Sequence, residues 1–410
     1  MKRTLLLTVL ATASAMACAQ DSVTLYGIVD AGVTSVSGLR GGSMTQLVSG
    51  IMDGSRIGIR VNEDLGGGYR AIATLEHRLE LDTGLTSNRP PSGSQLPDRL
   101  SQAALLGLPA ALQPAVTAVA GSIGSSVGVN LTNAFWDRQA FVGLVTPVGA
   151  VLAGRQYTPA YEISANFDTL GTQSALAAGQ VASTPASIDI RQSNALAYRI
   201  QLGGLSASAM VAAGEGSTTA GRFMGVMAMY KSDAFGVGLG YNTRENERGD
   251  KSLTSTVLGA SAKLGPGSLY LMGIDVQDDN PSGLSGISAL LAPQIGPAFA
   301  GAVQNAFVNG LKQDGQLMHV GYKLIAGLNT VYLAYSEYDD KRAANADTRS
   351  YGVAYTYALS KRTALNAVVA RFDNSGLGQA APGGAGYLGG VTASAATDST
   401  SLALGVRHSF

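Results

Sequence analysis

The sequence predicts an all-β protein whose strands close into a sixteen-stranded antiparallel transmembrane β-barrel. Charged residues make up only 14% of the chain, against roughly 25% in soluble domains. Hydrophobic residues make up 46%, yet no uninterrupted apolar run reaches the roughly 18 residues that a membrane-spanning helix needs. Segments of strand length with alternating apolar and polar side chains recur along the chain, as in strands with one face in lipid.

The composition also excludes some classes of protein and partner. The 28 basic residues equal the 28 acidic residues, so the formal net charge is zero, and the charge balance gives no reason to expect nucleic acid as a partner. Glycine contributes 53 of the 410 residues, a share well above the roughly 7% of average proteins. Few charges and many glycines argue against a soluble enzyme with a charged surface.

The first residues have the pattern of a cleaved signal peptide. Lys2 and Arg3 form a basic start, residues 5–11 are apolar, and Ala17–Ala19 has the small-x-small pattern of a cleavage site. A buried N-terminal helix is the alternative, but so short an apolar run beside two basic residues favours a signal. We predict a signal peptide over residues 1–19 and secretion across the inner membrane.

The only cysteine falls inside this signal. Cys18 could be the lipid-modified cysteine of a lipoprotein, but Ala15 occupies the position where that signal has a leucine-like residue. Cleavage after Ala19 removes the cysteine. The barrel domain, predicted over 20–410, then has no disulfide and no cysteine-based metal site.

Sixteen segments show the alternation that places one set of side chains on each face of a strand. An even number is what a barrel needs if both chain ends lie on one side of the membrane. The segments are 22–34, 54–63, 68–80, 134–145, 149–157, 192–203, 205–213, 222–231, 235–244, 253–264, 267–277, 314–325, 328–338, 348–358, 362–372 and 399–410.

The links between these segments are alternately short and long. Short links include 64–67, 146–148, 203–204, 265–266 and 326–327. Long links include 81–133, 158–191, 278–313 and 373–398. Short turns at one rim and long loops at the other are typical of outer-membrane barrels, and a closed barrel satisfies every backbone polar group in lipid.

Several motifs resemble those of Gram-negative general porins of the beta-proteobacterial branch. They are Ser22–Gly32, Ser55–Arg60, Glu63–Gly66, Arg138–Leu144, Gly154–Thr158, Tyr351–Thr363 and Gly405–Phe410. The resemblance implies a homotrimer of barrels in the cell outer membrane, with short periplasmic turns, long outer loops and an inward-folded third loop. It also implies contact with outer-membrane lipid and lipopolysaccharide, and passive passage of small hydrophilic solutes and ions.

Arginines on the inner face would line such a channel. Arg56 and Arg60 share a face opposite Ile57 and Ile59. Because apolar side chains belong against lipid, both arginines are predicted to face the water-filled interior. The same alternation argument places Arg155 on the inner wall.

For two further arginines, Arg138 and Arg191, alternation leaves the side open, and the resemblance implies that they join the basic wall. The inward-folded loop would be 158–191, with Glu162 and Asp168 as its early acids. A basic wall facing this loop would sort ions by charge at the narrowest section, and the excess of arginines predicts a mild preference for anions. Structural salt bridges, or rim charges in contact with lipopolysaccharide, are the alternative roles of these residues.

Two uncharged segments, 100–136 and 280–311, depart from the family pattern because they are longer than the loops it implies. Both are rich in alanine and leucine. Their prolines are Pro109, Pro114, Pro293 and Pro297. Transmembrane helices are one interpretation, but the prolines leave pieces too short to span. Phe299, Val303 and Phe307 recur at helical spacing, so we expect short helices in outer loops, packed on the barrel mouth or on a neighbouring loop.

No pattern indicates an enzyme, a cofactor or a metal site. His77, His319 and His408 lie on different strands, whereas a barrel hydrolase needs a histidine within reach of its nucleophile. The glycines of Gly236–Gly240 alternate along one strand, where we expect them to ease packing between neighbouring barrel walls. They do not form a phosphate-binding loop, which requires a βαβ unit.

The last strand carries a predicted assembly signal. Its alternating apolar positions end in Phe410, and an apolar stripe with a terminal aromatic resembles the signal that the barrel-assembly machinery reads. The favoured function is therefore a general diffusion porin. The alternative is a solute-specific channel, or a surface-exposed barrel whose enlarged loops bind a ligand or partner.

Overall fold

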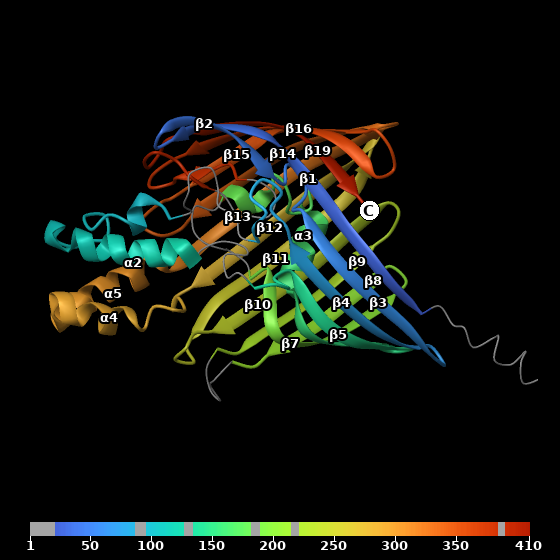
Figure 1. The fold of residues 1–410 in the computed structure, drawn as a ribbon, viewed down its shortest axis with the longest axis horizontal. Helices are drawn as coiled ribbons and strands as arrows, with labels where there is room; N and C mark the ends of the chain where they lie inside the picture. The colour runs from blue at the N-terminus through green and yellow to red at the C-terminus, as the bar shows by residue number, and fades with distance from the viewer. Residues whose placement is uncertain (1–20, 87–95, 127–133, 182–188, 215–220, 384–389) are drawn as a thin grey trace, which may run out of the picture.

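The computed structural model of the chain describes residues 21–86, 96–126, 134–181, 189–214, 221–383 and 390–410, and it shows a barrel (Figure 1). The wall strands are β1 (Ser22–Leu39), β3 (Arg56–Gly66), β4 (Tyr69–Arg78), β5 (Gln139–Thr146), β6 (Gly149–Tyr157), β7 (Arg191–Leu202), β8 (Leu205–Ala212), β9 (Phe223–Lys231), β10 (Phe235–Glu245), β11 (Lys251–Leu264), β12 (Gly267–Asp278), β13 (Gln313–Ala326), β14 (Asn329–Asp340), β15 (Thr348–Ala358), β16 (Thr363–Asn374) and β19 (Ser399–Ser409). Each pairs antiparallel with its neighbour in the chain, and β1 pairs with β19 to close the barrel. The sixteen-stranded prediction is confirmed. The predicted signal peptide over 1–19 lies outside the described residues.

One strand of the barrel sheet was missed by the alternation pattern. β2 (Gly42–Ser49) pairs with the second half of β1, whereas β3 pairs with the first half of β1. The sheet therefore has 17 strands, but β2 and β3 occupy a single position in the wall. The segment Gly50–Ser55 interrupts that position and lies next to the site described below.

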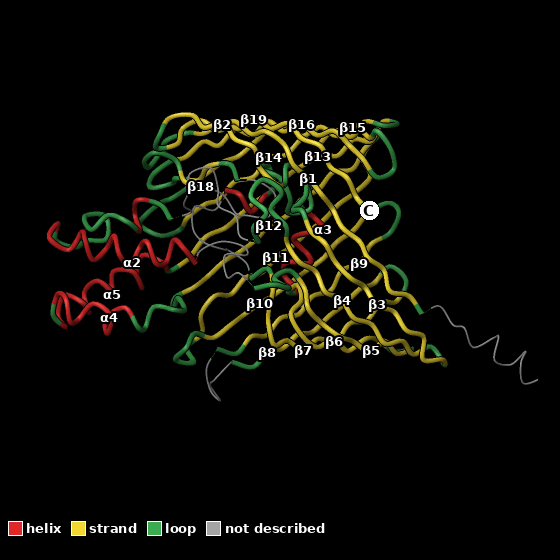
Figure 2. The backbone as a smooth tube through the Cα atoms, in the orientation of Figure 1, coloured by secondary structure: helices red, strands yellow, loops and turns green. Residues whose placement is uncertain are grey.

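The two ends of the barrel differ as predicted. At one end, which we call the turn end, links of a few residues join β3 to β4, β5 to β6, and so on to β15 and β16. Three of these turns contain a glycine in the left-handed region, with φ values of 58° for Gly203, 58° for Gly265 and 61° for Gly327, a conformation that glycine adopts without steric cost. The opposite, loop end carries all the long connections (Figure 2).

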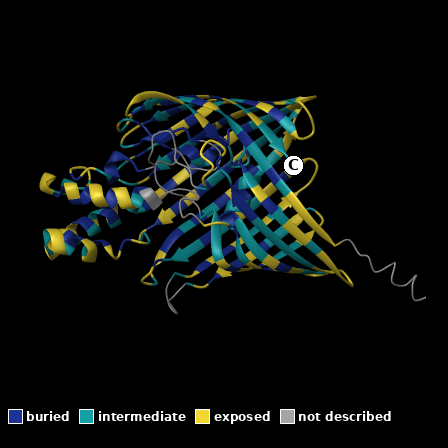
Figure 3. Cartoon of the chain, in the orientation of Figure 1, coloured by how far each residue is buried: buried dark blue, intermediate teal, exposed yellow. Residues whose placement is uncertain are grey.

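The wall strands alternate between buried inner and exposed outer side chains (Figure 3). On β13, Leu317 and His319 are 1% exposed, whereas Met318 and Val320 between and beside them are 65% and 43% exposed. The exposed positions of the wall are largely apolar. An apolar outer face is what a barrel in lipid requires.

Inside the barrel, the connection between β6 and β7 lies against the wall. It contains α3 (Pro159–Phe167) and a 3-10 turn, η3 (Ala178–Val181). Thr158 caps α3, since its side chain accepts a hydrogen bond from the Tyr161 N–H. The helix packs on β9, β10 and β11, so the expected inward-folded loop is present.

The alternating glycines of β10 make room for this helix. A Cβ atom on Gly238 would lie 2.8 Å from Phe167 and 2.9 Å from Ile163, and one on Gly240 would lie 2.8 Å from Ala160. The prediction that these glycines ease packing between barrel walls was therefore wrong about the partner. They form a groove on the inner wall, which α3 fills.

At the loop end, the two uncharged inserts form helices that extend beyond the barrel (Figure 1). The first contains η2 (Ala110–Leu112) and α2 (Gln113–Ser126) and follows a charged 3-10 turn, η1 (Asp98–Leu100). The second contains α4 (Ile287–Ile295) and α5 (Pro297–Leu311). In the described part of the chain, no helix is long and apolar enough to cross a membrane. The expected short helices are confirmed, and they pack on one another. A small hairpin of β17 (Ala380–Ala381) and β18 (Gly390–Val391) lies in the last long loop.

The C-terminal residue closes the seam between β19 and β1. The N–H of Gly27 donates to the Phe410 carbonyl, and the N–H of Phe410 donates to the Gly27 carbonyl, each at 3.1 Å. The aromatic ring occupies the space next to Gly27 that a Cβ would need. Phe410 is thus an integral part of the closing ladder.

Deleting Phe410 should lower the amount of folded barrel in the outer membrane while leaving secretion across the inner membrane intact, because the seam loses two hydrogen bonds and a terminal aromatic. The measurement is the heat-modifiable folded form in outer-membrane fractions, compared with the unfolded chain in the periplasm. Phe410→Trp, which keeps an aromatic ring, should retain most of the folded form. Normal surface levels of the deleted chain would contradict the prediction.

Candidate pore constriction

A row of arginines crosses the inner face of one side of the lumen. Arg56 on β3 stands directly opposite Arg78 on β4, and Gly58 stands opposite Glu76 in the same register. Opposite residues share one face of a sheet. Glu76 accepts a hydrogen bond from Arg138, which precedes β5. These three arginines therefore occupy neighbouring places on the wall.

Arg138 and Glu76 form a buried ion pair. Arg138 Nε donates to Glu76 Oε1 at 2.7 Å, and the two side chains are 2% and 5% exposed. Tyr26 Oη donates to the other carboxylate oxygen at 2.9 Å, and Arg138 Nη2 donates to Tyr157 Oη at 2.9 Å. Glu76 thus neutralises Arg138, whose position is tightly held.

Replacing Arg138 by methionine should lower the free energy of unfolding by about 3–5 kcal/mol, the range for breaking a buried pair, because the Glu76 carboxylate would stay buried without its cation. The measurement is urea-induced unfolding from phospholipid vesicles. Adding Glu76→Gln to the same chain should recover part of the loss. A loss of about 1 kcal/mol or less, as for exposed pairs, would contradict the prediction.

Arg155 and Arg191 continue the row toward β6 and β7. Arg155 donates from Nε to the Asp137 carbonyl at 2.7 Å and from Nη1 to Ser193 Oγ at 2.8 Å. Arg191 lies over the Tyr157 ring, with Cζ 4.9 Å from the ring centroid. Each guanidinium acts electrostatically on the other, and among the described residues neither lies within ion-pair distance of a carboxylate.

Alternation alone could not have determined the position of Arg155. The ladder between β6 and β7 is interrupted between Gly154 and Gln156, and Gly154 has a φ of 126°. Such a bulge changes which way the following side chains point. The hydrogen bonds to Asp137 and Ser193 place the Arg155 guanidinium beside the arginine row.

Arg60, the fifth predicted arginine, lies nearer the turn end. Its guanidinium carbon is 4.0 Å from the centroid of the Tyr26 ring, a cation–π contact. Arg60 is on the same face of β3 as Arg56 and is exposed. Among the described residues it forms no ion pair.

One acidic residue, Asp53, contacts the arginine row from the segment Gly50–Ser55, which joins β2 to β3. Three successive backbone N–H groups of the segment Gly50–Ser55 donate to the Asp30 carboxylate at 2.8, 3.0 and 2.9 Å. This arrangement holds the segment in place. Asp53 then pairs with Arg56 at 3.3 Å and with Arg407 of β19 at 2.5 Å.

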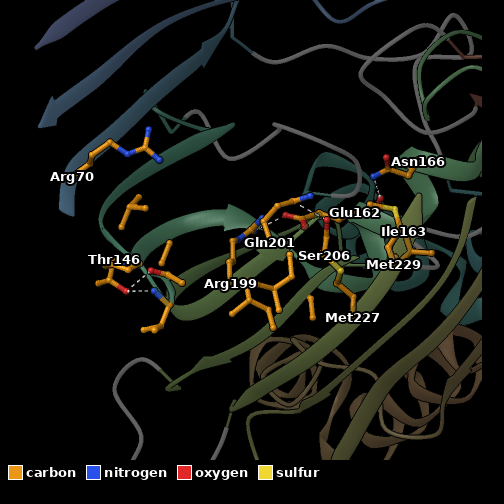
Figure 4. Close-up of a pocket in the computed structure, with 18 residues that line it drawn as sticks. Arg70, Thr146, Glu162, Ile163, Asn166, Arg199, Gln201, Ser206, Met227 and Met229 are labelled. Carbon is orange, nitrogen blue, oxygen red and sulfur yellow. Dashed lines mark hydrogen bonds and ion pairs between the residues drawn. The ribbon is translucent and has the colours of Figure 1, made fainter. Parts of the chain in front are cut away.

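The two acids predicted on the inward-folded loop are engaged elsewhere. Glu162 pairs with Arg199 of β7 at 2.5 Å, in a cavity of about 510 Å³ lined by α3 and the turn ends of β5 to β9 (Figure 4). Asp168 has a fully buried side chain, which accepts the N–H groups of Leu170 and Ala178 at 2.8 and 2.9 Å. Contrary to expectation, Asp168 has no surface on the lumen and instead holds the loop in shape.

The inward-folded loop is fastened to the wall opposite the arginines. Ile163 and Phe167 are completely buried against the glycine groove. Thr169 donates its N–H to His319 Nε2 at 3.1 Å, and the other ring nitrogen of His319 is 2.8 Å from Ser336 Oγ. The lumen thus has a strongly basic wall on one side and a packed loop on the other.

The charged residues of this site that the sequence analysis did not name include Arg78, Asp53 and Arg407. Arg78 shares its alternation with Glu76, and that signal could have found it. Asp53 and Arg407 come from an irregular segment and from the last strand, and they meet only through the register of the closed barrel. Alternation along a single strand cannot predict the contact between Asp53 and Arg407.

The closed barrel, its one-sided loop lengths and its charged lumen define a channel protein of the outer-membrane type. Residues 6–377 match the Gram-negative porin family, and the chain belongs to it. The short turns accordingly lie on the periplasmic side of the outer membrane, and the long loops lie outside the cell.

Known proteins agree with this assignment. The chain is 27% identical, over 431 aligned positions covering 100% of both chains, to outer membrane porin protein 32 of Delftia acidovorans. Its fold resembles the anion-selective porin of Comamonas acidovorans, with a TM-score of 0.67 at 22% identity over 95% of this chain and 100% of that one. The trimer form of OmpT of Vibrio cholerae is similar at a TM-score of 0.56 and 12% identity, covering 95% and 99%.

Proposed function

We propose that the protein is a general diffusion channel for small hydrophilic solutes and ions, with a mild preference for anions. The observation that carries the proposal is the excess of positive charge on the lumen wall. Of the arginines in the row, Arg138, Arg78 and Arg56 have carboxylate partners in Glu76, Glu80 and Asp53. Arg155 and Arg191 have no ion-pair partner among the described residues, although the nearby Asp137 carboxylate acts electrostatically on Arg155.

The acids of the inward-folded loop do not cancel the positive charge of the arginine row, which supports the same preference for anions. The carboxylates at the row belong to the barrel wall and to the segment Gly50–Ser55. Glu162, the inward-folded loop's other predicted acid, is neutralised by Arg199. Fixed charge near the narrowest section governs which ions pass, because salt screens charges beyond about 8 Å at physiological ionic strength. The similar Comamonas protein is itself described as anion-selective.

The test is the reversal potential of the purified protein in a planar bilayer under a salt gradient. A general porin should conduct without added ligand, and the sign of the potential should show anions to be more permeant than cations. The preference for anions should weaken as ionic strength rises, since the screening length becomes shorter. A cation-selective pore would overturn the assigned selectivity, and a protein that forms no pores would overturn the function.

Glu80 should make the selectivity depend on pH. Burial raises the pKa of the Glu80 carboxyl, which pairs with Arg78 just beyond the end of β4, to about 7. When pH falls through about 7, Glu80 gains a proton and loses its negative charge, so the arginine row becomes more positive. The anion preference should therefore rise on going from about pH 8 to about pH 6, a range in which ordinary carboxyls stay ionised.

The measurement is reversal potential against pH, and Glu80→Gln is the matched variant. The reversal potential of the Glu80→Gln pore should equal the low-pH value of wild type at every pH in this range. It should therefore not depend on pH. An unchanged pH profile in Glu80→Gln would contradict the assignment of the titration to this residue.

We propose a homotrimer as the working assembly. Support comes from membership of the porin family and from the apolar outer face of the wall, which gives neighbouring barrels a surface to share. Unboiled samples in mild detergent should run on gels as a trimer and convert to monomers on heating. A chain that remains monomeric in detergent and in chemical crosslinking of intact membranes would contradict this.

A further inference from the structure

The two uncharged inserts leave the barrel on opposite sides. The first connects β4 to β5, and the second connects β12 to β13. In one direction around the wall, the strands from β5 to β12 separate the inserts. In the other direction, the strands β13 to β16, β19, β1, β3 and β4 separate them. Each path contains eight strands, so the two inserts leave the barrel wall at opposite points of its circumference.

Despite these opposite roots, the inserts share one apolar core. Leu100 and Val116 of the first insert and Val303 and Phe307 of the second are all completely buried in a single cluster. The helices α2, α4 and α5 lie side by side beyond the loop end in Figure 1. The packing is close, since a Cβ atom on Gly310 would lie 2.7 Å from a Leu100 methyl group. We call residues 96–126 and 284–311 the helical brace.

Polar contacts fasten the base of the brace to the rim. Asp98 pairs with Arg40 at 2.5 Å, and its N–H donates to the Gln379 side chain at 2.6 Å. Arg99 donates to the Gly310 carbonyl at 3.3 Å, which joins the two inserts directly. The brace is therefore tied to the β1–β2 turn and to the last long loop, as well as to its own two roots.

We infer that the helical brace spans the outer opening and sets the largest solute that can enter from outside the cell. A structure rooted on opposite walls and joined by a dry core divides the opening beneath it into side passages. The described brace core is apolar, and the two charged residues at its base, Asp98 and Arg99, are engaged by Arg40 and by the Gly310 carbonyl. The brace therefore acts by steric exclusion. The arginine row then selects by charge deeper in the pore. This inference rests on the proposed channel function.

The test is polymer exclusion measured separately from each side of a planar bilayer. Neutral polyethylene glycols that enter a pore lower its conductance, and the size at which this effect ends is the cutoff for that side. The wild-type pore should show a smaller cutoff on the outer side than on the periplasmic side. Ala118→Cys on the exposed face of α2 identifies the outer side through a membrane-impermeant thiol reagent.

Phe307→Asp should remove the asymmetry, because an ionised carboxylate is strongly disfavoured in an apolar core and would separate the inserts. The outer cutoff should rise to the periplasmic value, which should not change. Phe299→Asp is the matched control: it makes the same substitution in α5 at a position that is 53% exposed, and its cutoffs should equal those of wild type. Chymotrypsin sensitivity of the inserts reports whether the brace has opened.

A second variant keeps the test independent of how Phe307→Asp folds. Replacing α4 and α5 by a short Gly-Ser linker leaves the wall strands intact and should give the same equal cutoffs. Equal cutoffs in the wild-type pore, or an unchanged outer cutoff once the brace is deleted, would overturn the inference. A wild-type protein without any ion conductance would instead overturn the channel function.

Discussion

Replacing Arg56, Arg155 and Arg191 together by glutamine should shift the reversal potential of the pore from anion preference toward cation preference. The physical reason is the balance of fixed charge at the basic wall. Arg155 and Arg191 lack carboxylate partners among the described residues, and removing Arg56 leaves Asp53 with Arg407 alone. Arg138 is kept because its loss would leave Glu76 buried and unpaired.

The size of this shift should depend on salt. At 0.1 M ionic strength the screening length is about 10 Å, and at 0.01 M it is about 30 Å. The difference between wild type and the triple variant should therefore be largest in dilute salt. In concentrated salt, where the fixed charges are screened, conductance should not fall, because the glutamine side chain is no larger than that of arginine.

A matched control changes the net charge equally on the outer face of the barrel. Arg222, Arg349 and Arg371 lie near the loop end, and their side chains are 62%, 63% and 39% exposed in ion pairs with nearby acids. Their replacement by glutamine should leave the reversal potential close to that of wild type. The same potential in wild type and in the lumen triple variant would place the selecting charges elsewhere.

Gly259→Val should reduce the single-channel conductance. The inner face of β11 at Gly259 is covered by the Phe167 ring, and a Cβ there would overlap that ring. A larger side chain must push α3 away from the wall and toward the arginine row, which narrows the passage. Overpacking of this kind also costs about 1–3 kcal/mol, so the variant should be somewhat less stable.

Gly273→Val is the control for this prediction. Gly273 lies on the next strand, β12, and a Cβ there would meet nothing within 4 Å. The same substitution should therefore leave conductance unchanged. Full conductance in Gly259→Val, with the loop still protected from proteases, would show that α3 does not border the narrowest section.

Much of the architecture follows from local patterns in the sequence. Alternation at period two locates all sixteen wall positions, since it depends only on neighbouring residues and on lipid outside the wall. The lengths of the links separate the periplasmic from the outer end. The absence of charge in the inserts, together with their prolines, predicts short helices. For Arg56 and Arg60, alternation predicts side chains that face the lumen, and both residues lie on one face of β3.

The site required contacts between residues far apart in the chain. Asp53 meets Arg407, and Thr169 meets His319, only because the closed barrel sets the register of strands that are distant in sequence. The bulge at Gly154 interrupts the alternation that would have placed Arg155.

The sequence by itself therefore determined the kind of barrel and the presence of a basic lumen, because strand periodicity and composition are local properties. The tertiary structure alone decided which carboxylates neutralise which arginines, why Gly238 and Gly240 are needed, and that the two inserts meet. Those outcomes depend on strand register and on packing across the lumen, and a period-two pattern carries no information about what lies on the opposite wall.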